Sequence, residues 1–230
     1  MRLNWDTSKR VVLRSNELPW QPSPAPGVLR RLLAREGGED ARATSVVRYE
    51  PGATFSRHAH PQGEEIIVLD GEFADERGTY PAGTYIKNPP GSAHSLRGSE
   101  GCTLFVKLGQ MDRDDLKRVV VLPSDRRWDP GLVRGLDVLA LDRFGTTHTA
   151  LVRWAPGTNF SKHHHFGGEE IFVLQGTFQD EFGDYPSGTW IRSPHMSTHQ
   201  PYSTAGCLIF VKVGHLLDAV SQRESDGWVG

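Results

Sequence analysis

Residues 58–66 read HAHPQGEEI, and residues 163–171 read HHHFGGEEI. The two stretches are 105 positions apart, and at this offset residues 44–109 align with residues 149–214 without a gap. Identical residues occupy 34 of the 66 aligned positions. A period of this length is too long for the repeat unit of a solenoid protein. The chain therefore contains the same domain twice.

Turn residues divide each copy into short segments. The 230 residues include 25 Gly and 15 Pro, and β-rich runs such as Glu65–Leu69 and Thr103–Lys107 lie between them. Short strands joined by tight turns are typical of β-sandwiches and barrels. We therefore expect an all-β protein of two tandem barrels, over residues 1–113 and 114–230, with a short helix at 216–223.

Composition excludes several classes of protein. The 26 Lys and Arg against 28 Asp and Glu give a net charge of −2, which does not suit a strongly basic nucleic-acid binder. No run approaches the roughly 20 apolar residues of a membrane span, and residues 1–13 lack the apolar segment of a signal peptide. The two cysteines are too few for a disulfide framework. We expect a cytoplasmic protein whose partners are neither nucleic acids nor membranes.

Six of the ten histidines fall on three positions that the copies share. Residues i and i+2 of a strand face the same side, so His58 and His60 can present both imidazoles to one centre. Glu64 follows across a turn and can return to that centre from the next strand, and His94 can approach it from a later one. The equivalent residues of the second copy are His163, His165, Glu169 and His199.

Three imidazoles and one carboxylate form a nitrogen and oxygen ligand set for a metal ion. Such a set suits Zn, Fe(II), Mn, Ni or Cu(II) and leaves coordination positions for water or substrate. An isolated histidine is more often an ordinary surface or core residue, but the repetition favours a site. We predict one divalent metal ion per barrel, with zinc and Fe(II) ahead of Mn and Ni. His195 adjoins the second set and is predicted to contact substrate or support the ligands from outside.

Both copies resemble cupins. In the first copy Gly52, His58, His60, Glu64 and Gly71 have the spacing of the first cupin motif, and the second copy repeats that spacing from residue 157 to residue 176. The second cupin motif is matched by Gly83, Pro89, Gly91 and His94, with Gly98 in place of the final Asn. In the second copy Met196 stands in place of the motif glycine and Ser203 in place of the Asn.

The sequence between these motifs is similar to the cupin domain of ChrR-type anti-sigma factors and to small cupin dioxygenases that cleave acetylacetone. The resemblance implies two double-stranded β-helix (jelly-roll) barrels, each with a metal ion bound inside by the two His, Glu and His set named above. Because Met196 replaces a glycine, we expect the turn at 194–199 to differ in shape from its counterpart. The pairs Asp75-Glu76 and Asp180-Glu181 are interpreted as solvated acidic turns.

The residues leave more than one function open. One hypothesis is a metal-dependent dioxygenase that acts on a small diketone or a hydroxylated aromatic ketone. A second is a ChrR-like regulator that senses a small molecule or an oxidant, and a third is a structural metal in a scaffold. ChrR-type regulators hold their sigma factor through a His-x3-Cys-x2-Cys module, a pattern that this sequence does not contain. We expect a small-molecule ligand or substrate, and exposed strand edges would permit a homodimer.

Overall fold

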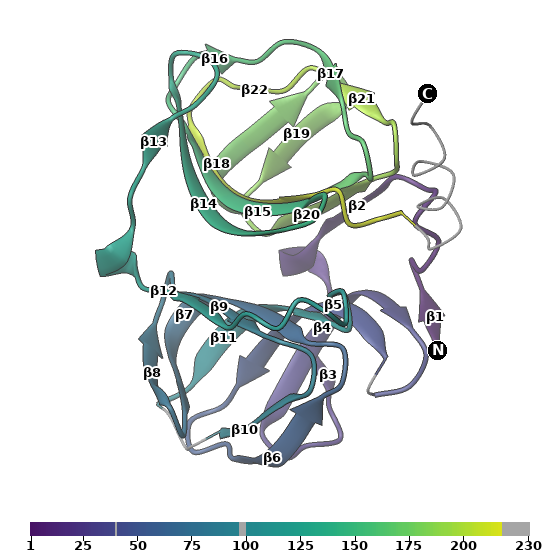
Figure 1. Cartoon of the computed structure of the whole chain (residues 1–230), viewed down its shortest axis with the longest axis vertical. Coiled ribbons are helices and arrows are strands. Elements are labelled where there is room, and N and C mark those ends of the chain that lie inside the picture. The colour runs from purple at the N-terminus through teal and green to yellow at the C-terminus, as the bar shows by residue number, and fades with distance from the viewer. Residues whose placement is uncertain (40, 97–99, 218–230) are drawn as a thin grey trace. The chain divides into compact units, whose positions relative to one another are not determined.

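The computed structural model of the chain describes residues 1–39, 41–96 and 100–217 (Figure 1). These residues form β-strands and two 3-10 turns, η1 (Ser15–Glu17) and η2 (Pro123–Asp125). The prediction of an all-β fold is confirmed. No helical segment in the described part of the chain has the length and hydropathy that crossing a membrane requires. The helix expected at 216–223 falls mainly on residues outside that part.

The chain folds into two compact units. The first comprises residues 1–5 and 15–127, and the second comprises residues 6–14 and those from 128 onward. By contacts the chain divides at 127/128, because β12 (Val119–Val121) pairs with β9 (Tyr85–Asn88) of the first unit. The expected boundary between the two copies at 113/114 stays a prediction.

One strand near the start of each copy is exchanged. Residues 10–13 read RVVL and residues 118–121 read RVVV, so they are equivalent in the repeat. Residues 11–13 belong to β2 (Val11–Arg14), which pairs with β20 (Thr189–Ser193) of the second unit. Residues 119–121 form β12, which pairs with β9 of the first unit. Each copy therefore contributes one early strand, β2 or β12, to the unit that the other copy mainly builds.

The first unit is an antiparallel barrel in which neighbouring strands follow the order β1-β4-β5-β11-β7-β10-β6. β7 belongs to both walls, because its first part pairs with β9 and β11 and its last part with β8 and β10. The strands other than β9 and β12 are β1 (Arg2–Leu3), β3 (Gln21–Pro22), β4 (Val28–Glu36), β5 (Arg42–Tyr49), β6 (Phe55–His60), β7 (Glu64–Asp75), β8 (Gly78–Pro81), β10 (Ser92–Leu96) and β11 (Cys102–Leu108).

The second unit repeats this plan, with the order β13-β14-β15-β23-β18-β20-β2. β18 takes the place of β7 and pairs with β20, β23 and β19. The strands other than β2 and β20 are β13 (Asp129–Pro130), β14 (Leu136–Phe144), β15 (Thr147–Trp154), β16 (Thr158–Asn159), β17 (His163–His164), β18 (Glu169–Asp180), β19 (Gly183–Pro186), β21 (Thr198–His199), β22 (Tyr202–Ser203) and β23 (Cys207–Val213).

Each barrel packs its own apolar core on the inner faces of its strands. On β7 the inward residues are Ile66 and Val68, and the period of two along a strand puts Glu64 on the same face. Cys102 and Cys207 are buried in the two cores, as small apolar side chains would be. The alternation that builds the core therefore also aims the carboxylate of Glu64 into the barrel.

One motif glycine is required by the backbone. Gly71 has a φ of 72°, in the left-handed region, and a β-carbon at this position would collide with the carbonyl oxygen of Gly101. Gly176 has the same conformation and meets Gly206 in the same way. These glycines let β7 and β18 pass close to the loop that precedes β11 and β23.

Candidate metal centre

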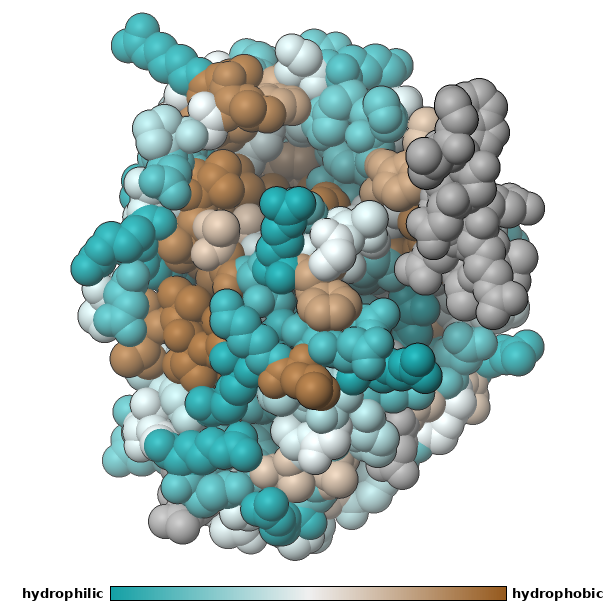
Figure 2. Space-filling model, viewed as in Figure 1, coloured by the Kyte–Doolittle hydropathy of each residue, from teal (hydrophilic) through white to brown (hydrophobic). Residues whose placement is uncertain are grey.

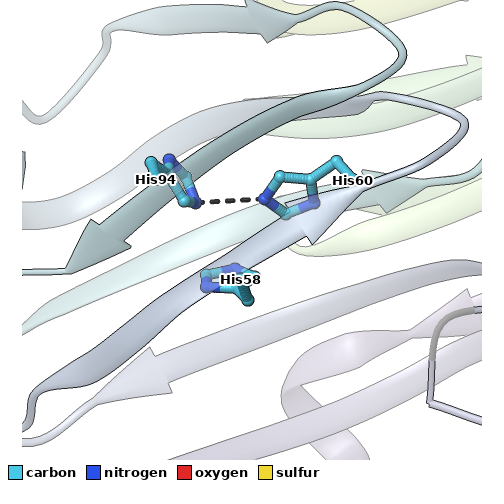
Figure 3. Close-up of side chains that lie close together, drawn as sticks. All are labelled: His58, His60 and His94. Carbon is cyan, nitrogen blue, oxygen red and sulfur yellow. Dashed lines mark hydrogen bonds between the residues drawn. The ribbon is translucent and has the colours of Figure 1, made fainter.

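Three histidines of the first unit converge on one point (Figure 3). His58 and His60 lie on β6, and His94 lies on the neighbouring strand β10 directly opposite His58. His60 Nε2 is 3.2 Å from His94 Nε2. One ring nitrogen from each of the three lies within 4.8 Å of the others. The i, i+2 spacing therefore brings the histidines together as the sequence predicts.

Glu64 joins this group from the start of β7. Its Oε2 atom is 3.5 Å from His60 Nε2 and 3.6 Å from His94 Nε2. Asn88 on β9 donates a hydrogen bond to the same oxygen over 3.0 Å. All four predicted residues of the first copy thus face a common centre.

The second unit reproduces the arrangement. His163 on β17 is paired with His199 on β21, and together with His165 they place ring nitrogens within 4.8 Å of one another. Glu169 Oε2 is 3.6 Å from His165 Nε2 and 3.8 Å from His199 Nε2. His164, between two members of the group, is exposed, as expected for the outer face of a strand.

Hydrogen bonds fix which ring nitrogen faces the centre. His58 Nδ1 lies 3.1 Å from the carbonyl oxygen of Ser56, and His163 Nδ1 lies 2.9 Å from that of Ser161. A carbonyl oxygen only accepts, so Nδ1 carries the proton in both rings. Nε2 is then left with a free lone pair, which is the form that binds metal ions.

The atoms at the centre fit a cation. His165 Nε2 and Glu169 Oε2 are fully buried and have no hydrogen-bond partner among the described residues. Each such unsatisfied buried atom costs about 1–3 kcal/mol, so several lone pairs aimed at one point favour a shared positive ion. The nitrogen and oxygen donors suit zinc, Fe(II), Mn or Ni. Each unit therefore has a group that could hold one metal ion.

Burial changes the pKa values of the donor groups and keeps two of the imidazoles neutral, which is the form that binds a metal ion. Burial lowers the pKa of His60 to about 4 and that of His165 to about 3, so both rings are neutral at pH 7. Burial raises the pKa of Glu169 to about 7 in the absence of a cation. A metal ion would favour the charged carboxylate and lower that pKa.

An aspartate stands behind one histidine of each group. His199 Nδ1 lies 3.4 Å from Asp180 Oδ2, and His94 Nδ1 lies 3.7 Å from Asp75 Oδ2. Burial lowers the pKa of His199, but the hydrogen bond with Asp180 and the negative charges of Glu169, Asp180 and Glu181 together outweigh burial, so the pKa is raised. Both aspartates are buried, so their interpretation as solvated turn residues is wrong. The sequence indicates this role only in that both copies have an aspartate at this position, Asp75 and Asp180.

The aspartates are themselves held by a tyrosine. Tyr185 donates its hydroxyl proton to Asp180 Oδ1 over 2.6 Å, and Tyr80 donates to Asp75 Oδ1 over 3.3 Å. Arg118, which immediately precedes the exchanged strand β12, donates in turn to Tyr80 over 3.0 Å. In the second unit, hydrogen bonds therefore link Tyr185, Asp180 and His199 behind the metal-binding group, whereas in the first unit the 3.7 Å between Asp75 and His94 is an ion-pair distance.

His195 lies in the turn between β20 and β21 and contacts the turn that precedes Glu169. Its side chain is exposed, and its Nδ1 accepts a hydrogen bond from the Gly167 N–H over 2.8 Å. Its ring meets the ring of Phe166 edge-on with centroids 5.1 Å apart. His195 does not line the pocket above the second group. Its role as a substrate contact or outer support stays a prediction.

The turn that contains Met196 keeps the shape of its counterpart. Met196 has a φ of 60°, close to the 78° of Gly91, and its N–H donates to the His165 carbonyl over 2.9 Å as that of Gly91 does to the His60 carbonyl. The expectation of a different turn shape is wrong. The methionine instead adopts a left-handed conformation that is costly for any residue with a β-carbon.

A pocket opens above each group. The first has a volume of about 240 Å³ and includes His58, His60 and Glu64 in its lining. The second has a volume of about 180 Å³ and includes His163, Glu169 and His199. Figure 2 shows a hollow in the unit that carries β18 and β19, with apolar side chains at its rim and in its depth. A small molecule could therefore reach both groups.

Comparisons with known proteins agree with this architecture. The family model of the ChrR cupin-like domain matches residues 8–112 and 116–217. No curated protein matches the chain.

Similar solved structures include a putative dioxygenase of Nostoc punctiforme PCC 73102, at 16% identity over 92% of this chain and 85% of that one, with a TM-score of 0.76. Protein YlbA of E. coli shares 16% identity over 91% and 92% of the two chains, with a TM-score of 0.69. A formate complex of Lactobacillus farciminis oxalate decarboxylase shares 13% identity over 90% and 86%, with a TM-score of 0.63. These likenesses establish the fold, and the family match over both copies shows that the chain is a tandem bicupin that belongs to the ChrR cupin-like domain family.

Proposed function

We propose that the protein is a metal-dependent dioxygenase that holds one divalent metal ion in each barrel and acts on a small diketone or a hydroxylated aromatic ketone. The observation that carries the proposal is the convergence of three imidazoles and one carboxylate at the floor of a pocket. Four protein ligands leave coordination positions open for two oxygen atoms of a substrate or for dioxygen.

His58, His60, Glu64 and His94 would hold one ion, and His163, His165, Glu169 and His199 the other. Bound Fe(II) would supply the activation of dioxygen and the Lewis acidity that favours the enolate of a diketone. The protein orients His58 and His163 through the carbonyl oxygens of Ser56 and Ser161, and it orients His199 through Asp180. Trp154, Phe160 and Phe178 line the second pocket and would exclude water from the reacting atoms.

Oxygen consumption tests this function. We expect protein purified anaerobically and loaded with Fe(II) to take up oxygen with a β-diketone, and the combined variant with all of His58, His60, His163 and His165 changed to Ala to lose this activity. His164→Ala is the matched control, because this exposed residue is adjacent to two predicted ligands and should leave the uptake unchanged. Absence of uptake across a panel of diketones and hydroxylated aromatic ketones would overturn the proposal.

A second candidate function is regulatory sensing, which the match to the ChrR cupin-like domain supports. In that case each site would hold zinc and bind a small molecule or an oxidant without turnover. Tightly held zinc, no oxygen uptake and a ligand-dependent rise in melting temperature would favour this function. We propose a cytoplasmic location for either function, since two cysteines are too few for the disulfide framework of a small secreted domain.

A further inference from the structure

We infer that the two barrels bind ligands of different charge: the first takes a small anion that carries a carboxylate, and the second takes an uncharged molecule with an apolar body. The inference rests on the proposed function, because each ligand would approach the metal ion of its own pocket. It follows from the side chains that line the two pockets.

The second pocket has no charged residue in its lining other than the metal-binding residues themselves. Apart from His163, Glu169 and His199, every residue of its lining is apolar. The walls include Val138, Trp154, Phe160 and Phe178, and Leu132 lies at the mouth with 90% of its surface exposed. A carboxylate placed against these walls would lose its hydration and would find no cationic partner among them; the one polar side-chain atom of the named wall residues is the buried indole Nε1 of Trp154. An uncharged ligand with apolar substituents loses little and buries its own surface.

The first pocket is more polar than the second, and apart from its metal-binding residues its charged side chains have an excess of one positive charge. Arg30, Arg35 and Glu39 belong to its lining, together with Ser45 and Gln62. Arg30 binds Glu39 through two hydrogen bonds, of 2.6 and 3.0 Å, so one of the two guanidinium charges is balanced.

The second guanidinium is less well satisfied. The side chain of Arg35 is 5% exposed. Its Nη1 donates a hydrogen bond to the Gly38 carbonyl and lies 3.7 Å from Glu39, but its Nε has no hydrogen-bond partner among the described residues. A buried cation with a free donor favours an anionic ligand in the same pocket.

The repeat shows that this difference lies at matched positions. Arg30 on β4 pairs with Val47, and Val138 on β14 pairs with Val152, which is the repeat equivalent of Val47. The first barrel therefore has an arginine where the second has a valine, in the same place on the wall. By the same reasoning Arg35 corresponds to Arg143, which is exposed and does not line the second pocket.

Two further wall positions differ in the same direction. Ser45 and Gln62 line the first pocket, and their equivalents at the repeat offset are Ala150 and Gly167. Neither of these lines the second pocket. The two copies thus keep the same metal-binding residues but have changed the chemistry of the wall that a ligand contacts.

Binding of two matched diketones tests the inference. Acetylacetone and acetylpyruvate share the diketone group, and only the second carries a carboxylate. Each would be titrated anaerobically into full-length protein loaded with Co(II), and the visible absorption of the cobalt would report binding. The double variant His163→Ala with His165→Ala leaves only the first site, and His58→Ala with His60→Ala leaves only the second.

We expect the first site to prefer acetylpyruvate by about tenfold and the second to prefer acetylacetone, since hydrogen bonds to a charged group are worth about a factor of ten or more. Arg30→Val should remove most of the first site's preference, and Val138→Arg should shift the second site toward acetylpyruvate. Arg143→Ala is the control and should change neither preference. If Val138→Arg does not fold, Arg30→Val alone decides, because it introduces the residue that the second barrel already has.

The inference would be overturned if both sites preferred the same diketone equally, or if Arg30→Val left the preference of the first site unchanged. Cobalt binding would still support the metal sites in that case. Failure of the protein to bind cobalt at either site would overturn the proposed function and the inference with it. Opposite preferences without oxygen uptake by the Fe(II) protein would support the inference and contradict only the dioxygenase activity.

Discussion

Arg10 donates a hydrogen bond to the hydroxyl of Tyr185 over 2.6 Å, although 175 positions separate them in the sequence. The same guanidinium nitrogen is 3.3 Å from Asp180 Oδ2, the oxygen that faces His199. Arg10 immediately precedes β2, the strand that the first copy contributes to the second unit. A residue of the first copy thus supports the metal-binding group of the second.

This exchange predicts reciprocal effects of two arginine substitutions. Arg10→Ala should weaken metal binding at the second site by about tenfold, and Arg118→Ala should do the same at the first, because outer hydrogen bonds orient the ligands. Titration of each variant against a chromophoric chelator, with the other site removed by His to Ala substitutions, measures both affinities. An effect of Arg10→Ala confined to the first site would show that the strands are not exchanged.

Loss of the carboxylate of Asp180, which hydrogen-bonds to His199, should weaken metal binding at the second site more than Arg10→Ala does. Burial acts to raise the pKa of Asp180, but hydrogen bonds that include those of His199 and Tyr185 hold it below its usual value, so the group is charged at pH 7. Asp180→Asn removes that charge, and we expect the affinity of the second site for zinc to fall by about 10- to 100-fold. Asp184→Asn, on the next strand, is the control. Equal zinc affinity in Asp180→Asn and the parent protein would disprove the support role.

The effect of Glu169→Gln on the free energy of unfolding should change sign when the metal ion is removed. Burial raises the pKa of Glu169 from 4.5 to about 7 in the metal-free fold. A group with a raised folded-state pKa contributes its stability below the unfolded pKa and loses it as pH rises through the folded one, here between about pH 4.5 and 7. Metal-free Glu169→Gln should therefore be more stable than the parent at pH 8 by roughly 3 kcal/mol, and about equal to it at pH 4.

In the metal-loaded protein the same substitution should destabilise, because a ligand is lost. Urea denaturation with and without a chelator measures both effects, and Glu72→Gln at an exposed position provides the control. The account fails here if Glu169→Gln changes stability in the same direction with and without metal.

The left-handed turn of the second copy predicts a stabilising substitution. Met196 has a φ of 60° and half of its surface is exposed, so its replacement by Gly removes backbone strain and little packing. We expect Met196→Gly to raise the free energy of unfolding by about 0.5–1 kcal/mol, the difference between the left-handed strain and the chain entropy of glycine. Gly91→Ala should lower it by a similar amount. A loss of stability in Met196→Gly, measured by urea denaturation, would contradict this explanation.

The sequence predicts the features that depend on local spacing. The strand period of two was enough to bring His58 and His60 to one side, and the repeat identified their partners His94 and Glu64 without knowledge of the barrel. The residue type at 196 wrongly predicts a different turn, because hydrogen bonds to the His165 carbonyl hold the backbone in a left-handed conformation that methionine disfavours.

Other features depend on pairing between distant segments, which local patterns do not encode. Nothing near Arg10 indicates that β2 pairs with β20, so the support of Asp180 by Arg10 could not be foreseen. The charge of the first pocket depends likewise on which face of β4 Arg30 occupies, and that is settled by the register with β5. Register and strand exchange arise from packing over the whole barrel.

The number of metal ions bound per chain tests the central claim most directly. Elemental analysis of untagged protein, after loading and desalting, should give two divalent ions per chain. It should give one in His58→Ala with His60→Ala, one in His163→Ala with His165→Ala, and two in His164→Ala. A chain that retains no metal, or the same content in all four proteins, would contradict the account.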